Sequence, residues 1–253
     1  MRTSPAPTSL ALAERLNVQA VVATIAATQD LSPRLREVVL SGAAVVAGQA
    51  GNDVMVVVGD GESRTNRRYS VRSVDTVADT ITLWIATNHE GPGATWATTA
   101  EVGDQVDLVG PRGKITLDPL ADWHLFIGDV TALASFYRMA EAIEVPGKAI
   151  FIVEVDHMDD AVTAAFDEGL GVTGIFVERQ GRDYHDPTGA LAGLSAFDFP
   201  EHEGHAYVFA EFNVVKAVVT ALRDRGLSDE QINTKAFYRT GRANATNGEP
   251  VKD

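Results

Sequence analysis

The pattern of apolar residues changes once along the chain, at Asp118-Pro119, and this change restricts the fold more than any single motif does. Before it, short runs rich in β-branched residues alternate with turn residues, and a helical pattern appears only near Thr95–Ala100. After it, apolar runs alternate with helical stretches. The first pattern predicts an antiparallel β-barrel. The second predicts a parallel sheet with helices on its faces, which binds ligands at the carboxyl ends of its strands.

The two patterns divide the chain into four expected parts. A flexible N-terminal segment (1–17) precedes a six-stranded antiparallel barrel domain (18–118), which is followed by a Rossmann-like α/β domain (119–242) and a polar C-terminal tail (243–253). The expected barrel strands are Val18–Thr28, Leu35–Leu40, Val54–Val58, Arg64–Arg72, Thr80–Ala86 and Gln105–Val109. The expected strands of the second domain are Trp123–Ile127, Ala149–Val155, Gly174–Glu178, Ala206–Ala210 and Lys235–Arg239, with helices over Thr131–Ile143 and Val214–Arg225.

The stretch Arg64–Arg72 carries four arginines and a tyrosine within an otherwise acidic chain. Alternation along a strand places Arg68, Ser70 and Arg72 on one face, and Arg67, Tyr69 and Val71 on the other. A guanidinium beside an aromatic ring suits a ligand that is both anionic and flat. The alternative is an edge strand whose charges discourage aggregation.

Composition excludes several classes of function. The chain has 21 basic and 35 acidic residues and a net charge of −14, which argues against a general surface for nucleic acid or anionic membranes. It contains no cysteine, so disulfides, thiolate metal sites and iron–sulfur clusters of its own are excluded. Glu201–His205 has metal-ligand residue types but no regular element to hold them, and we expect no metal site. With no apolar stretch of membrane-spanning length, a soluble cytoplasmic protein is the simplest expectation.

A Gly-Pro-Gly turn leads into the short helical segment near Thr95. Such a turn leaves backbone amides unpaired at a helix N-terminus, where a pyrophosphate binds favourably. The residues that form this expected site are Gly91, Pro92, Gly93, Ala94, Thr95 and Trp96. The alternative is an ordinary connection between two barrel strands.

A second junction of this kind lies in the α/β part, at Gly128–Ala134. Gly128 and Asp129 end a predicted strand, and Thr131 is placed to cap the helix that follows. Amides at such a junction can face a phosphate or a nicotinamide. The alternative is a well-capped helix without a ligand.

These segments resemble, in the same order, those of the siderophore-interacting proteins, a group of FAD-containing ferric-siderophore reductases with a ferredoxin-reductase-like fold. Arg67-x-Tyr69-Ser70 is similar to the flavin motif of that superfamily, and Gly91–Ala97 to the family's pyrophosphate turn. The further similar segments are Gly103-Asp104, Gly110–Gly113, Gly128–Ala134, Ala210-Glu211 and Phe237–Gly241. Gly93-Ala94, Val130, Ala134 and Ala210 depart from the family's residues.

The resemblance implies an FAD-binding barrel domain and an NAD(P)H-binding-like domain. It implies that Arg67 holds the pyrophosphate, that Tyr69 stacks on the flavin and that Ser70 hydrogen-bonds near N5, which makes Tyr69 and Ser70 the catalytic candidates. Arg68 and the Gly91–Trp96 turn are further FAD contacts. In the second domain the implied cofactor contacts are Gly128, Asp129, Thr131, Ala210, Glu211 and Tyr238.

The implied activity is reduction of a ferric siderophore or another ferric chelate, which releases Fe(II), with NAD(P)H or alternatively ferredoxin as the electron donor. Arg64, Arg68 and Arg72 are expected to offer positive charge to the chelate, unless they only balance nearby carboxylates. Val130, Ala134 and Ala210 keep open a second interpretation, an FAD-binding electron carrier or flavoenzyme with a degenerate nicotinamide site and a non-iron substrate. A third is a non-enzymatic ligand-binding protein on the same scaffold.

Overall fold

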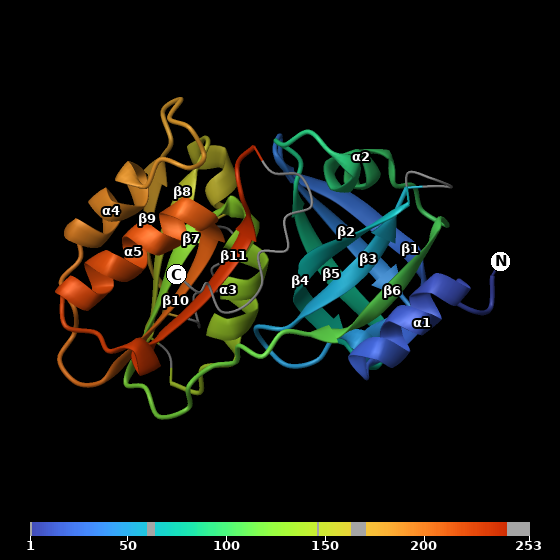
Figure 1. Cartoon of the computed structure of the whole chain (residues 1–253), viewed down its shortest axis with the longest axis horizontal. Helices are drawn as coiled ribbons and strands as arrows, with labels where there is room; N and C mark the ends of the chain where they lie inside the picture. Colours follow the sequence, from blue (N-terminus) through green and yellow to red (C-terminus); the bar gives the residue numbers. More distant parts are fainter. Residues whose placement is uncertain (1, 60–63, 146, 163–170, 242–253) are drawn as a thin grey trace. The chain divides into compact units, whose positions relative to one another are not determined.

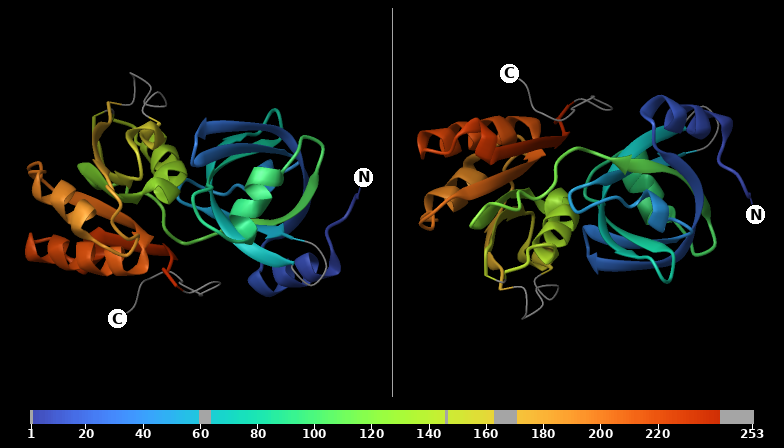
Figure 2. Two further views of the ribbon diagram at one scale, coloured as in Figure 1. Left: turned by 90° about the horizontal axis from the view of Figure 1, so that it is seen from above. Right: turned by 90° about the horizontal axis from the view of Figure 1, so that it is seen from below.

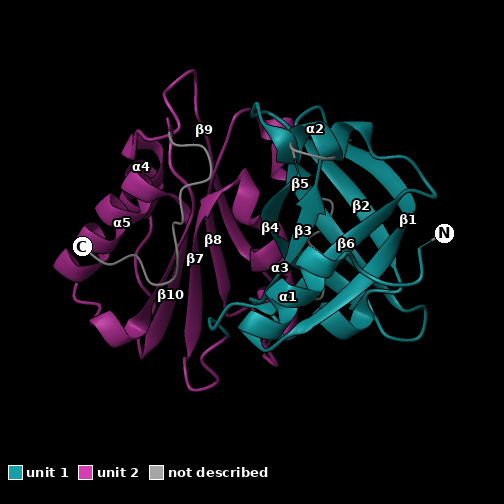
Figure 3. Cartoon of the chain, turned by 45° about the vertical axis from the view of Figure 1, so that its right-hand side comes forward, with its two compact units in different colours: residues 1–116 teal, residues 117–253 magenta. Residues whose placement is uncertain are grey.

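The computed structural model describes residues 2–59, 64–145, 147–162 and 171–241. The chain forms two compact units, Met1–Thr116 and Leu117–Asp253, which are coloured separately in Figure 3. The predicted C-terminal tail lies outside the described residues.

Unit 1 is a closed barrel of six antiparallel strands in the order β1-β2-β5-β4-β3-β6, as the sequence predicts. Figure 2 shows the strands closing into a ring. The strands are β1 (Gln19–Ser32), β2 (Leu35–Ser41), β3 (Asp53–Val58), β4 (Thr65–Asp75), β5 (Thr80–Ala86) and β6 (Gln105–Arg112). Two short helical elements connect them, a 3₁₀ turn at Ala44–Val46 and helix α2 (Pro92–Thr99), which lies within a few residues of the expected segment.

Alternating side chains fill the barrel. Leu40 of β2 lies opposite Ile81 of β5, Val38 lies opposite Leu83, and all four are fully buried. Each such side chain contributes about 1.5–3 kcal/mol of transfer free energy when it leaves water. A strand register shifted by one residue would expose this set, so the period-two pattern in the sequence also fixes the register.

The segment before Val18 is not the flexible segment that the sequence suggests, because Pro7–Leu16 forms helix α1. The carboxylate of Asp107, in the last barrel strand, holds this helix by accepting hydrogen bonds from the Ala6 amide at 2.8 Å and the Ser9 hydroxyl at 2.7 Å. The apolar side of α1 packs on Met55 and Val109. The partner residues are about a hundred positions away in the sequence, which is why a local reading misses this contact.

Unit 2 is a five-stranded sheet in the order β11-β10-β7-β8-β9, and every neighbouring pair is parallel, which confirms the predicted α/β architecture. The strands are β7 (Trp123–Asp129), β8 (Ala149–Val155), β9 (Thr173–Glu178), β10 (Gly204–Glu211) and β11 (Ile232–Tyr238). The chain runs outward from β7 to β9 and then returns to the other side of β7 through β10. The carboxyl ends of β7 and β10 therefore flank the topological switch point, where sheets of this kind bind ligands.

Helices cover the two faces of this sheet, and Figure 1 shows α4 and α5 side by side on one of them. The helices are α3 (Leu133–Glu141), α4 (Thr188–Ser195) and α5 (Phe212–Asp224), with 3₁₀ turns at Val130–Ala132, Met158–Ala161 and Asp229–Gln231. Leu125 and Ile127 of β7 pack with α4 and α5, whereas Phe126 between them packs on Phe136 of α3. Within the described residues, no helix combines the length and apolar character needed to cross a bilayer.

Candidate functional site

In unit 1 the arginine strand and the Gly-Pro-Gly turn meet. The ring centroids of Tyr69 and Trp96 are 5.9 Å apart. A Cβ placed on Gly93 would overlap the Tyr69 hydroxyl and lie 3.4 Å from Cγ of Arg67. Arg67 and Tyr69 therefore flank the first turn of α2, although 24 residues or more separate them from Gly93 in the sequence.

Arg67 differs from the other arginines of this stretch in its charge balance. Its Nη1 donates to the Thr65 hydroxyl and the Asn66 carbonyl, both at 2.9 Å, and it has no carboxylate partner among the described residues. Arg68 lies on the opposite face of β4 from Arg67. Two of its three guanidinium nitrogens bind Asp53, with Nε–Oδ1 at 3.0 Å and Nη2–Oδ2 at 2.6 Å. The Arg67 guanidinium thus retains its charge for an anion, whereas that of Arg68 is neutralised.

The two remaining arginines also have partners. Arg64 forms an ion pair with Asp107 at 2.8 Å, and the guanidinium of Arg72 lies 4.9 Å from the centroid of the Trp84 ring. The expectation that Arg68 offers unbalanced positive charge to a ferric chelate is therefore not supported, because it balances the Asp53 carboxylate, as the alternative interpretation has it. Arg64 shares the single Asp107 carboxylate with Arg2, so its charge is only partly balanced.

Helix α2 begins at Pro92 without a side-chain cap. Gly91, the residue before it, has φ of +139°, a conformation that L side chains rarely adopt. The Thr95 amide is the first to enter the helical ladder, donating to the Gly91 carbonyl at 3.0 Å. The amides of Gly93 and Ala94 are therefore available at the positive end of the helix, next to Arg67.

The two hydroxyls of the motif occupy different surroundings. Burial raises the pKa of Tyr69, against the opposing effect of Arg67, so its hydroxyl is neutral at physiological pH. Ser70 is 8% exposed and lies opposite Asp53 in the register of β3 and β4. These groups offer an aromatic surface, a hydroxyl, a guanidinium and two amides. That set matches the flat ring and the pyrophosphate of the flavin cofactor that the resemblance implies.

In unit 2 the carboxyl ends of β7 and β11 are joined through Asp129. Its Oδ1 accepts from both the amide and the hydroxyl of Thr131, and its Oδ2 accepts from the Tyr238 hydroxyl at 3.0 Å. Asp129, and not Thr131 as expected, caps the 3₁₀ turn that leads into α3. Burial and the nearby Asp129 carboxylate raise the pKa of Tyr238.

The other predicted residues of unit 2 have structural contacts. A Cβ on Gly128 would overlap the Phe209 carbonyl oxygen, so glycine is needed for close packing between β7 and β10. The Glu211 carboxylate is fully buried, caps α5 and accepts from the Thr240 amide at 3.0 Å. The methyl group of Ala210 belongs to the apolar core, and Val130 and Ala134 are buried as well.

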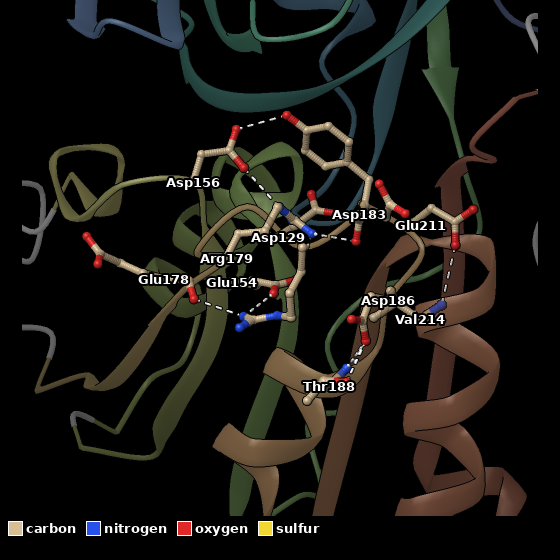
Figure 4. Close-up of polar contacts among 12 residues, drawn as sticks. Asp129, Glu154, Asp156, Glu178, Arg179, Asp183, Asp186, Thr188, Glu211 and Val214 are labelled. Carbon is tan, nitrogen blue, oxygen red and sulfur yellow. Dashed lines mark hydrogen bonds and ion pairs between the residues drawn. The ribbon is translucent and has the colours of Figure 1, made fainter.

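Sequence reasoning missed a charged network at the carboxyl ends of β8 and β9, shown in Figure 4. We call Glu154, Asp156, Arg179, Arg182 and Tyr184 the Arg179 network. Arg179 binds Glu154 at 3.0 Å and Asp156 at 2.9 Å, and its guanidinium carbon lies 4.4 Å from the Tyr184 ring centroid. The residues that follow Asp156 form a capping box on the next 3₁₀ turn, through His157 and Asp160.

The buried position of this network affects its acid–base behaviour. Burial raises the pKa of Glu154, and Arg179 and Arg182 oppose that effect. The surrounding carboxylates raise the pKa of Arg179 despite its burial. The alternation of acids and arginines in Glu178–Asp186 was the one signal in the sequence for this network. Only the sheet order shows that this segment lies next to Glu154 and Asp156.

Known proteins resemble both parts of the chain. A family model described as the siderophore-interacting FAD-binding domain matches residues 49–115, and one described as siderophore-interacting protein matches residues 121–241. Ferric vibriobactin reductase ViuB from Vibrio cholerae is 33% identical over 95 residues, 37% of this chain and 35% of that protein. The chain thus spans about a third of the length of this curated relative.

Solved structures share the fold. A siderophore utilization protein from T. fusca superposes with a TM-score of 0.77 at 23% identity, covering 91% of this chain and 96% of that one. A ferredoxin NADP+ reductase from Neisseria gonorrhoeae, solved with bound FAD and NADP, gives a TM-score of 0.67 at 15% identity, covering 86% of this chain and 98% of that one. Likenesses at this level of identity establish the ferredoxin-reductase-like fold.

Proposed function

Because the chain belongs to the siderophore-interacting protein family, we propose that it is an FAD-dependent oxidoreductase that reduces a ferric siderophore or another ferric chelate. Electrons come from NAD(P)H: one hydride equivalent reduces two ferric ions to Fe(II) and leaves one proton. A chelator with hard oxygen ligands holds Fe(II) far less tightly than Fe(III), so reduction releases the metal. We place this reaction in the cytoplasm, where reduced pyridine nucleotides are formed.

One observation carries the cofactor assignment. Within the stretch that matches the FAD-binding domain, Arg67 has no carboxylate partner among the described residues and runs beside the uncapped N-terminus of α2. The guanidinium and the Gly93 and Ala94 amides would hold the pyrophosphate. When bound, FAD supplies the conversion of a two-electron donor into single-electron chemistry.

The other residues of unit 1 would orient the cofactor. The Tyr69 ring, supported by Trp96, would offer the stacking surface, and its neutral hydroxyl avoids repulsion of an anionic cofactor. The Ser70 hydroxyl would donate a hydrogen bond at the flavin edge. Asp53 already engages Arg68 in a bidentate ion pair, so we propose for Arg68 a supporting role in the position of β4 instead of direct contact.

The interpretation as an electron carrier with a degenerate nicotinamide site rests on Val130, Ala134 and Ala210. All three are buried, and the Ala210 methyl packs in the core beneath α5, so we propose that these replacements leave nicotinamide access unchanged. Asp129, with Thr131 and Tyr238, would border the nicotinamide at the switch point.

The test uses the purified protein in the absence of oxygen. A visible flavin spectrum that bleaches with NADH or NADPH, and returns as a ferric chelate is added with stoichiometric Fe(II) captured by a ferrous-specific chelator, would support the proposal. Reduced ferredoxin in place of the nucleotide tests the other donor. A protein that cannot be reconstituted with FAD, or a photoreduced flavin that no ferric chelate reoxidises, would refute it.

A further inference from the structure

The Arg179 network occupies the edge of unit 2 where a dinucleotide would place its adenosine half. In doubly wound sheets the strand after the first one commonly ends in a carboxylate that binds the ribose 2′-hydroxyl, and an arginine there accommodates a 2′-phosphate instead. Here β8 follows β7 and ends at Glu154 and Val155, directly before Asp156, while β9 beside it leads into Arg179. Both kinds of residue are present, so their contacts must decide which ribose fits.

The contacts show that the arginines are already neutralised. The Arg179 side chain is 6% exposed and lies between the carboxylates of Glu154 and Asp156. Arg182 Nη2 donates hydrogen bonds to the Glu154 carboxylate and to the Glu178 carbonyl oxygen, both at 2.9 Å. Neither guanidinium presents an unbalanced charge comparable to that of Arg67 in unit 1.

The network is also held in place. Tyr184 donates its hydroxyl to Asp156 at 3.0 Å while its ring lies against the Arg179 guanidinium. At the start of α4, a Cβ on Gly189 would overlap Glu154 Oε1 and lie 2.7 Å from Arg182 Nη2, so the helix packs directly on this ion pair. A bound phosphate that drew Arg179 away from its partners would leave buried carboxylates unpaired.

The negative charge around the Arg179 network also disfavours binding of a 2′-phosphate. Figure 4 shows that Glu178, Asp183 and Asp186 lie on the same edge as Glu154 and Asp156, which makes five carboxylates against two arginines. Asp183 is exposed, and its carboxylate makes no hydrogen bond or ion pair with the described residues. A 2′-phosphate adds nearly two negative charges to this edge, whereas a 2′-hydroxyl adds none and can donate a hydrogen bond to a carboxylate.

We infer that the carboxyl edge of β8 and β9 selects a pyridine dinucleotide with a free 2′-hydroxyl on its adenosine ribose, so that NADH and not NADPH is the electron donor. Asp156 is the specificity-determining residue, since it both holds Arg179 and faces the edge. The inference rests on the proposed function, because it assumes that unit 2 binds a pyridine nucleotide.

Binding of the oxidised nucleotides tests this selectivity without relying on turnover. Isothermal titration calorimetry of the oxidised FAD-loaded protein should give a dissociation constant for NAD⁺ at least tenfold lower than for NADP⁺. Asp156→Asn removes one charge and loosens the hold on Arg179, and it should reduce this ratio about three- to tenfold. Asp183→Asn removes an exposed charge from the same edge without breaking a hydrogen bond or ion pair to the described residues. It should reduce the ratio of the two dissociation constants by a smaller factor.

Glu201→Gln is the matched control, because it removes the same charge from an exposed turn before β10, at the amino ends of the strands. It should leave the ratio unchanged. Equal or tighter binding of NADP⁺ by the unaltered protein overturns the inference, as does a ratio that neither Asp156→Asn nor Asp183→Asn reduces. Binding of neither nucleotide at millimolar concentration also overturns it. In that case reoxidation of the photoreduced protein by a ferric chelate still tests the reductase proposal separately.

Discussion

Arg67 and Arg68 are adjacent in β4, but their replacement by alanine should have different effects. Arg67→Ala should weaken FAD binding, whereas Arg68→Ala should lower the free energy of unfolding. Among the described residues Arg67 donates hydrogen bonds only to a neighbouring hydroxyl and carbonyl, so its loss should cost the apoprotein no more than about 1 kcal/mol. A charged hydrogen bond to the pyrophosphate is worth about 1.5–3 kcal/mol, so Arg67→Ala should raise the dissociation constant of FAD about 10- to 150-fold.

Arg68→Ala should have the opposite profile. It leaves the Asp53 carboxylate, whose side chain is 2% exposed, without its bidentate partner. Breaking a fully buried pair costs about 3–5 kcal/mol, but the Arg68 side chain is 31% exposed, so we expect a loss of about 2–3 kcal/mol in the free energy of unfolding. The affinity of the folded variant for FAD should change less than threefold, because the Arg68 guanidinium is engaged by Asp53 and is not proposed to contact the cofactor.

Two measurements on each apoprotein check this pair of expectations, urea unfolding and titration of FAD fluorescence quenching. Arg67→Lys serves as a control, since it keeps the charge but loses the planar fork of donors and should recover part of the affinity. Equal loss of FAD affinity in both alanine variants, or none in Arg67→Ala, would refute the reasoning that an unpaired arginine marks the cofactor face.

Three other changes have defined outcomes. Gly93→Ala puts a methyl group against the Tyr69 hydroxyl, so it should displace the ring and weaken FAD binding several-fold; unaltered affinity would show that the ring adjusts freely. Ala210→Gly should leave the rate of flavin bleaching by NADH unchanged, since the methyl is in the core, and a faster rate in stopped-flow experiments would contradict this. Burial and the neighbouring His205 lower the pKa of His124 to about 4, so His124 is neutral in the folded protein. The contribution of neutral His124 to the free energy of unfolding should therefore be fully present above about pH 6.5 and fall by up to about 3 kcal/mol towards pH 4. Unfolding curves of His124→Phe should lack this loss of stability at low pH, and an identical pH dependence in the variant would argue against the assignment.

Local patterns predicted the architecture because both units obey simple periodicities. The barrel strands follow period-two alternation, and the change of pattern at Asp118-Pro119 lies within two residues of the division between the units. The meeting of Arg67 with the Gly93 turn could be anticipated only through the resemblance to a family, since nothing local in the sequence links them. The roles assigned to the individual site residues stay predictions.

What the sequence did not show depends on long-range partners. The expectation that Arg68 carries a free charge was wrong because Asp53, which neutralises it, lies on another strand. The partners of Arg64 and Arg2 were not visible for the same reason, since both bind Asp107 of β6. The Arg179 network was missed for the same reason, since its acids end one strand and its arginines follow the next. Charge on a strand is therefore informative about ligands only after its cross-strand partners are known.

Helix α1 has a consequence for the order in which the chain is made. Ser9 and its partner Asp107 are 98 residues apart, so α1 has no Asp107 anchor until the last barrel strand has been synthesised. At about 5–20 residues per second this interval is about 5–20 s. During it the apolar side of α1, which later covers Met55 and Val109, remains unprotected, whereas β1 can already pair with β2 and lacks only β6. Helix α1 is therefore synthesised well before the strand that anchors it, so its apolar side waits longer for its partners than an element with local contacts does.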